Sequence, residues 1–133
     1  MYIFTLVDRV YKVVEKLRIQ RGDYKLAMLY NSSVLDTPTG WNLIVSSDWT
    51  HALGVAPATR IIARDLYDEL GPHERTWLSR ITVLPTTDAF VRDMTRLYPV
   101  ITHKGAVPLS HLSAGGITEG AGFVFYSQPE VPA

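Results

Sequence analysis

The sequence contains no cysteine. Disulfide bonds, thiolate metal sites and cysteine nucleophiles are therefore excluded. It also contains no apolar run that approaches the roughly 20 residues needed to cross a bilayer. Its first residues, MYIFTLVDRV, lack the basic start and the uninterrupted apolar stretch of a signal peptide. These features favour a cytoplasmic protein without a membrane-spanning segment.

Net charge is also missing, because 13 basic and 13 acidic residues cancel. A neutral chain has no overall attraction for nucleic acid or for an anionic membrane. Copies of it repel one another weakly, which favours self-association. The 133 residues, of which 47% are hydrophobic, are enough to bury a core as one domain. We assign residues 1–127 to this domain and residues 128–133, which include two prolines, to a loose C-terminal tail.

The stretch from Tyr24 to Trp49 contains the two clearest strands. The segments 25–30 and 41–47 are apolar on both faces, which is typical of interior strands, and turn-forming residues separate them. Residues 1–20 before them carry the apolar stripe of a helix, which Gly22 can end. The stripe consists of Ile3, Leu6, Val7, Val10, Val13, Val14 and Leu17.

The rest of the chain alternates between helical and strand patterns. In chain order, we predict a loop over 47–54, a helix over 57–70, a short helix over 73–79 with Trp77 inward, a strand over 80–84, a helix that Thr86 or Thr87 caps and Pro99 ends, a mobile glycine-rich loop over 110–122, and a strand over 123–126. This order predicts a single α+β domain, in which helices pack on a mixed sheet of about four strands.

Two short segments carry a resemblance. Tyr30-Asn31-Ser32-Ser33 follows the first strand, and Gly40-Trp41-Asn42 opens the second. The order of elements over residues 5–98, with Ser32 after the first strand, is similar to the minimal nucleotidyltransferase fold. Members of that superfamily have a Gly-Ser turn after the first strand, Asp-x-Asp on the second and a third carboxylate on a later strand. The resemblance implies a nucleotidyltransferase-like domain in which Asn31 replaces the glycine.

The same resemblance implies that the metal site is gone. In the superfamily, the carboxylates hold two magnesium ions that carry a nucleoside triphosphate. Here Gly40 and Asn42 occupy the first two carboxylate positions, and the third falls near Ile81 or Thr82. Neutral side chains cannot offset the charge of two divalent cations. We therefore expect a pseudoenzyme with no cofactor.

Other polar residues leave alternatives open. Asp36 and Asp48 flank the region and are candidates for displaced metal ligands. Ser47, Asp48 and His51 are the residue types of a hydrolase triad, but triads are recognised by geometry, the chain has no Gly-x-Ser-x-Gly pattern, and we favour a polar loop as the explanation.

The remaining candidates are His103, His111 and the segment GGITEGAG. The two histidines have the chemistry of metal ligands, with Asp48 or His51, but their spacing matches no ligand motif. The glycine-rich segment lacks the phosphate-binding patterns and indicates a flexible loop. Trp49 is the tryptophan we expect beside a cleft, because it follows a strand end.

We interpret the chain as a non-catalytic binding or regulatory protein. The candidate ligand-binding residues are Ser32, Asn42, Asp48, Trp49 and His51. One alternative is a small enzyme with its site in the loop 46–54. Another is a nucleic-acid-associated protein that uses the basic first helix, although we do not expect nucleic acid as a partner. The expected partner is a second copy or another protein, and we predict a homodimer formed through the apolar last strand, 123–126. The alternative is that Phe123, Val124 and Phe125 fill the core of a monomer.

Overall fold

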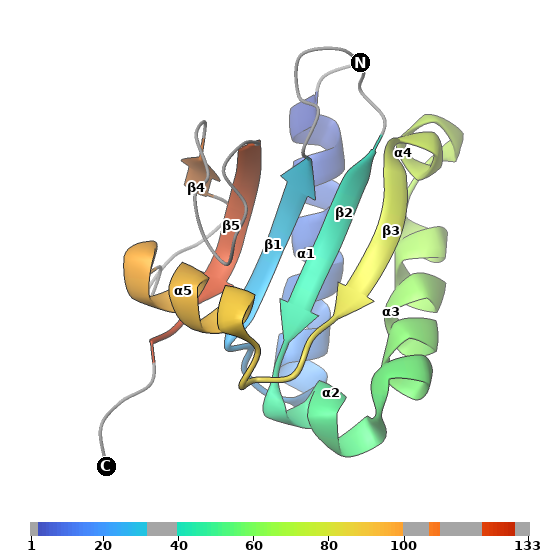
Figure 1. The fold of residues 1–133 in the computed structure, drawn as a ribbon. Helices are drawn as coiled ribbons and strands as arrows, with labels where there is room; N and C mark the ends of the chain where they lie inside the picture. Colours follow the sequence, from blue (N-terminus) through green and yellow to red (C-terminus); the bar gives the residue numbers. More distant parts are fainter. Residues whose placement is uncertain (1–2, 32–39, 100–106, 110–120, 130–133) are drawn as a thin grey trace.

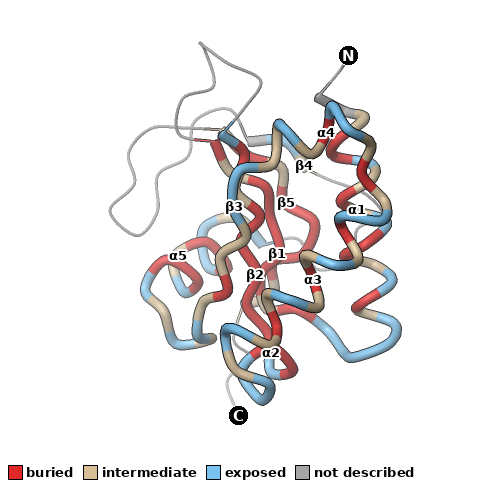
Figure 2. Tube along the Cα trace, turned by 90° about the vertical axis from the view of Figure 1, so that its right-hand side faces the viewer, coloured by how far each residue is buried: buried red, intermediate tan, exposed pale blue. Residues whose placement is uncertain are grey.

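The computed structural model describes residues 3–31, 40–99, 107–109 and 121–129, and side chains from residue 5 onward within them, except that of Leu109. They form one α+β unit in which a mixed sheet lies between two helical layers (Figure 1). Viewed from the side, α5 covers one face of the sheet, and α1 and α3 cover the other (Figure 2). None of the helices in these ranges combines the length and the apolar character that crossing a bilayer requires.

The sheet has the strand order β3-β2-β1-β5-β4. The strands are β1 (Leu26–Asn31), β2 (Trp41–Ser46), β3 (Leu78–Val83), β4 (Val107–Leu109) and β5 (Ala121–Ser127). β1 is central and runs antiparallel to both β2 and β5, whereas β2 and β3 are parallel. A parallel pair needs a long crossover, and three helices between β2 and β3 provide it.

The helices follow the apolar patterns of the sequence. They are α1 (Ile3–Arg21), α2 (Asp48–Leu53), α3 (Val55–Glu69), α4 (Pro72–Trp77) and α5 (Ala89–Leu97). The apolar stripe predicted for the first helix is buried where the structure describes its side chains, from Leu6 to Leu17. Trp77, which we predicted to point inward, packs partly buried against the larger core cluster.

Both faces of the sheet bury apolar side chains. Leu29, Leu43 and Phe125 point to the α1 and α3 side and have no solvent exposure. Met28 and Val124 point to the other side, where Met94 of α5 packs with them. The prediction that the first two strands are interior is confirmed, because four consecutive residues of β1, from Leu26 to Leu29, are fully buried.

The strand count is five, one more than we predicted. The additional strand, β4, has three residues, and Pro108 is the central one. Such a segment shows no alternation of apolar and polar residues, and proline lacks the N–H of a ladder hydrogen bond. β4 lies at the sheet edge, a position that proline tolerates, although the sequence did not indicate this strand.

Two predictions of local structure were wrong. Residues 48–53, predicted as a loop, form the helix α2, which Ser47 caps. Asp88, and not Thr86 or Thr87, caps α5, because its carboxylate accepts a hydrogen bond of 2.8 Å from the N–H of Phe90. Elsewhere boundaries differ by one or two residues: α4 gives way to β3 at Leu78, whereas we predicted the strand from Arg80.

The last strand is not an edge. β5 lies between β1 and β4, and Val124 and Phe125 have no solvent exposure. The prediction that this strand forms a dimer edge was therefore wrong, because its apolar residues fill the core of the single chain. Residues 110–120 of the predicted mobile loop lie outside the described residues, whereas Ala121 and Gly122 begin β5. Gln128, the first residue of the predicted tail, donates its N–H in a hydrogen bond of 2.8 Å to the carbonyl of Lys25, and residues 130–133 lie outside the described residues.

Candidate functional site

The end of β1 and the beginning of β2 meet at one end of the sheet, because the two strands are antiparallel (Figure 1). Gly40 enters β2 with φ of 89°, a conformation that glycine adopts without strain. Its N–H donates a hydrogen bond of 2.9 Å to the hydroxyl of Ser79, the second residue of β3. This polar contact fixes the beginning of β2 to the beginning of its neighbour β3.

Asn42 lies two residues after Gly40, near the beginning of β2. It is on the sheet face that α5 covers, but α5 covers that face near the other end of β2. It pairs in register with Tyr30 of β1 on one side and with Arg80 of β3 on the other. Its side-chain oxygen accepts a hydrogen bond of 2.9 Å from the hydroxyl of Thr82. Asn42 and Thr82 are half-buried, and Arg80 is exposed. We call Gly40, Asn42, Ser79, Arg80 and Thr82 the strand-end cluster.

Tyr30 borders the strand-end cluster. Burial raises the pKa of its hydroxyl, so the side chain is neutral and can donate or accept a hydrogen bond at physiological pH. On its other side, Tyr30 pairs with Gly122 of β5. A Cβ atom at Gly122 would lie 2.7 Å from the carbonyl oxygen of Leu29 and 3.0 Å from the methyl group of Met28. β5 can therefore approach β1 here only because this residue is a glycine.

The four candidate ligand-binding residues that the structure describes, Asn42, Asp48, Trp49 and His51, do not lie together. Ser32 lies outside the described residues, and so does Asp36. Asn42 is near the beginning of β2, whereas Asp48, Trp49 and His51 follow its end. A six-residue strand is about 20 Å long, so the structure separates these two groups by the length of the strand.

Ser47 is held by its role as the cap of α2. Its hydroxyl accepts a hydrogen bond of 3.0 Å from the N–H of Thr50, and the Thr50 side chain returns a contact of 3.2 Å with the N–H of Ser47. Ser47 is buried, whereas Asp48 and His51 are exposed. Ser47 and Thr50 thus form a reciprocal capping pair. This role explains the serine without assigning it the function of a nucleophile.

Trp49 is buried in an aromatic cluster. Its ring packs edge-on against Tyr24 with centroids 6.0 Å apart, and the guanidinium of Arg21 lies 5.7 Å above it. Tyr24 also stacks on Tyr126. Burial, and then the negative charge of Glu15, raise the pKa of Tyr24, so it stays neutral well above its ordinary range.

The basic residues of α1 face carboxylates of the neighbouring helices. Arg9 pairs with Glu74 of α4 at 3.1 Å, and Lys12 and Lys16 pair with Glu69 and Asp65 of α3, each at 3.7 Å. Arg18 pairs with Glu15 and Asp23. These ion pairs neutralise the cations that a nucleic-acid face would need, so they speak against the first helix as such a face.

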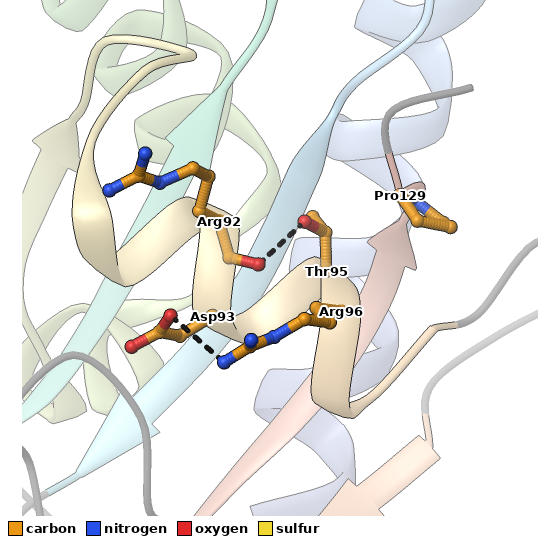
Figure 3. A pocket seen from close by; sticks show the side chains of 5 residues that line it. All are labelled: Arg92, Asp93, Thr95, Arg96 and Pro129. Atoms are coloured by element: carbon orange, nitrogen blue, oxygen red, sulfur yellow. Dashed lines mark hydrogen bonds and ion pairs between the residues drawn. The ribbon is translucent and has the colours of Figure 1, made fainter. Parts of the chain in front are cut away.

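A shallow hollow of about 460 Å³ lies on α5 beside the C-terminal segment (Figure 3). Arg92, Asp93, Thr95, Arg96 and Pro129 line it. Arg96 pairs with Asp93 at 3.5 Å, and Thr95 donates its hydroxyl to the backbone of its own helix. Figure 3 shows the Arg92 side chain directed away from Arg96 and Pro129, so the two guanidinium groups do not converge on one ligand position.

Comparison with known proteins gives no match: no family model, no curated protein and no solved structure matches this chain. Within the described parts of the chain, histidine and carboxylate side chains do not gather in any group of three that could hold a metal ion. His103 and His111 lie outside those parts. We therefore take the strand-end cluster as the candidate site, because it brings together polar residues of β2 and β3 and includes the exposed cation Arg80.

Ser79 and Arg80 are the residues of this site that the sequence did not indicate. The third carboxylate position was expected near Ile81 or Thr82, and Thr82 does contact Asn42. Arg80 comes beside Asn42 only through the parallel register of β2 and β3. A parallel register across a crossover of about 30 residues leaves no periodic signal in the sequence, so this pairing could be found only from the folded chain.

Proposed function

We propose that this chain is a non-catalytic binding or regulatory domain, and that it is a degenerate nucleotidyltransferase-like domain whose ligand site is the strand-end cluster. The observation that carries the proposal is the hydrogen bond of 2.9 Å from Thr82 to Asn42. In the superfamily that the sequence resembles, carboxylates on neighbouring strands hold magnesium. In this proposal, the neutral side chains of Asn42 and Thr82 replace two of these carboxylates, and they form a hydrogen bond with each other in place of metal contacts.

The residues of the cluster do not fit a magnesium ion. Magnesium requires oxygen ligands in near-ideal octahedral geometry, and carboxylates supply most of the charge that it needs. The Asn42 oxygen is already an acceptor for Thr82, and the neighbouring position on β3 carries the cation Arg80. A guanidinium beside the site repels a divalent cation, so we derive no catalytic step that passes through a metal.

Thermal unfolding with nucleotide and metal tests this proposal. A ligand at a hundred times its dissociation constant adds about 2.7 kcal/mol of stability, which corresponds to a rise of several degrees in Tm. We expect no rise in Tm that requires ATP and magnesium together. A rise with both, absent with either alone, would overturn the non-catalytic proposal.

The double variant Asn42→Asp with Thr82→Asp is the matched control. It places two carboxylates where the present oxygen atoms are 2.9 Å apart. Like charges at this distance repel, so the variant should be less stable than the natural chain in EDTA. Magnesium should recover part of that loss in the variant and leave the natural chain unchanged, which shows that the assay detects a metal site at this position.

A further inference from the structure

The strand-end cluster presents hydrogen-bond donors. The Asn42 oxygen accepts the Thr82 hydroxyl, which leaves the two N–H bonds of the Asn42 amide to donate. The Ser79 hydroxyl accepts the N–H of Gly40, and its own proton is available to a second acceptor. Arg80 adds five N–H donors in a planar group. The five members of the cluster include no carboxylate.

Arg80 differs from the cations of α1. Arg9, Lys12 and Lys16 each face a carboxylate of another helix. Across the described ranges, no carboxylate lies within ion-pair distance of Arg80, and its side chain is exposed. It pairs in register with Asn42, so the cation and the amide donors are on adjacent strands and on the same face. An anion placed between them would receive donors from both strands.

We propose that the strand-end cluster binds the phosphate or carboxylate group of a small molecule directly, without a divalent cation. This inference rests on the proposed function and names the ligand chemistry of the same site. Guanidinium and amide groups match the oxygen atoms of such anions, and hydrogen bonds to a charged partner are about twice as strong as neutral ones. The site thus binds an anion directly, at a position where members of the superfamily that the sequence resembles bind a nucleotide through metal ions.

The hollow on α5 supplies a matched control cation. Arg92 is exposed like Arg80, lies on the helix and is directed away from Arg96 (Figure 3). Substitution of either arginine by glutamine removes one positive charge and keeps a polar side chain. The change in net charge is therefore equal in Arg80→Gln and Arg92→Gln, and only the position differs.

Titration calorimetry with pyrophosphate and with citrate, each in EDTA and again in excess magnesium, tests the proposal. We expect the natural chain and Arg92→Gln to bind at least one of these probes with similar affinity. Arg80→Gln should bind it at least about tenfold more weakly, the change that corresponds to about 1.4 kcal/mol. The two probes distinguish a phosphate site from a carboxylate site. Circular dichroism and Tm of both variants confirm that each is folded.

Three results would overturn the proposal. They are no binding of either probe at millimolar concentration, an equal loss in Arg92→Gln, and binding that requires magnesium. The first two leave the proposed function intact, because a non-catalytic domain can bind a ligand of another chemistry. The third contradicts both proposals together, so the failure of one is distinguishable from the failure of the other.

Discussion

Two adjacent serines should respond in opposite ways to the same substitution. Ser46 and Ser47 are both buried, with exposed fractions of 0% and 1%. The Ser47 hydroxyl caps α2 through the N–H of Thr50 at 3.0 Å. The Ser46 hydroxyl has no hydrogen-bond partner in the described structure. Replacing each by alanine therefore removes the same atom from two different environments.

The expected magnitudes follow from these contacts. Loss of a serine cap costs about 0.5–2 kcal/mol, and Ser47→Ala also removes the contact of 3.0 Å between the hydroxyls of Ser47 and Thr50. We therefore expect a loss of about 1–2 kcal/mol. Ser46→Ala removes a buried hydroxyl that folding leaves unsatisfied, so it should be neutral or stabilise the chain by up to about 1 kcal/mol.

Urea unfolding followed by tryptophan fluorescence measures both changes. The midpoint should fall for Ser47→Ala, and stay or rise for Ser46→Ala, with the same slope in each case. Ser47→Asp should retain most of the stability, because aspartate is also a good cap. If Ser46→Ala lowers the free energy of unfolding as much as Ser47→Ala does, the loss arises from replacing any buried serine at this strand end. The capping explanation would then be wrong.

Two further predictions concern pH and assembly. Because burial raises the pKa of Tyr24 above its ordinary value near 10, the folded chain keeps a proton that the unfolded chain loses, so stability should decrease above about pH 10. Tyr24→Phe should make that decrease shallower in alkaline urea unfolding, and an unchanged slope would contradict the assignment. For assembly, we expect self-association through the edge of β3, the longer of the two edge strands in the described sheet. Sedimentation equilibrium at micromolar concentration should show a dimer, and a single species of 14.9 kDa would exclude it.

The parts of the fold that the sequence predicted are those with strong local patterns. β1 and β2 consist of apolar residues bounded by turn-forming ones, and the structure places both within one residue of the predicted ranges. α2 was missed because six residues carry too little periodicity. Its capping pair, Ser47 and Thr50, was nevertheless present in the sequence and is the signal that could have found it.

The candidate site was only partly predictable, and the reason is physical. Asn42 was singled out by its place at the start of β2, and the structure puts it in a polar cluster. Asp48 and His51 were singled out by residue type and by their closeness in sequence, and they lie exposed on a short helix at the other end of β2. Proximity in sequence does not bring side chains together when a strand separates them, whereas strand register does.

The neutral net charge of the chain conceals an uneven distribution. On α1, each of Arg9, Lys12 and Lys16 has a carboxylate partner on α3 or α4, so these charges cancel locally. Arg80 has no such partner in the described ranges and stands beside an amide. A single exposed cation on a neutral protein attracts ligands only within about a Debye length, roughly 8 Å at physiological salt. Affinity at the strand-end cluster must then come from direct hydrogen bonds, so it should depend only weakly on salt, unlike binding to a basic surface.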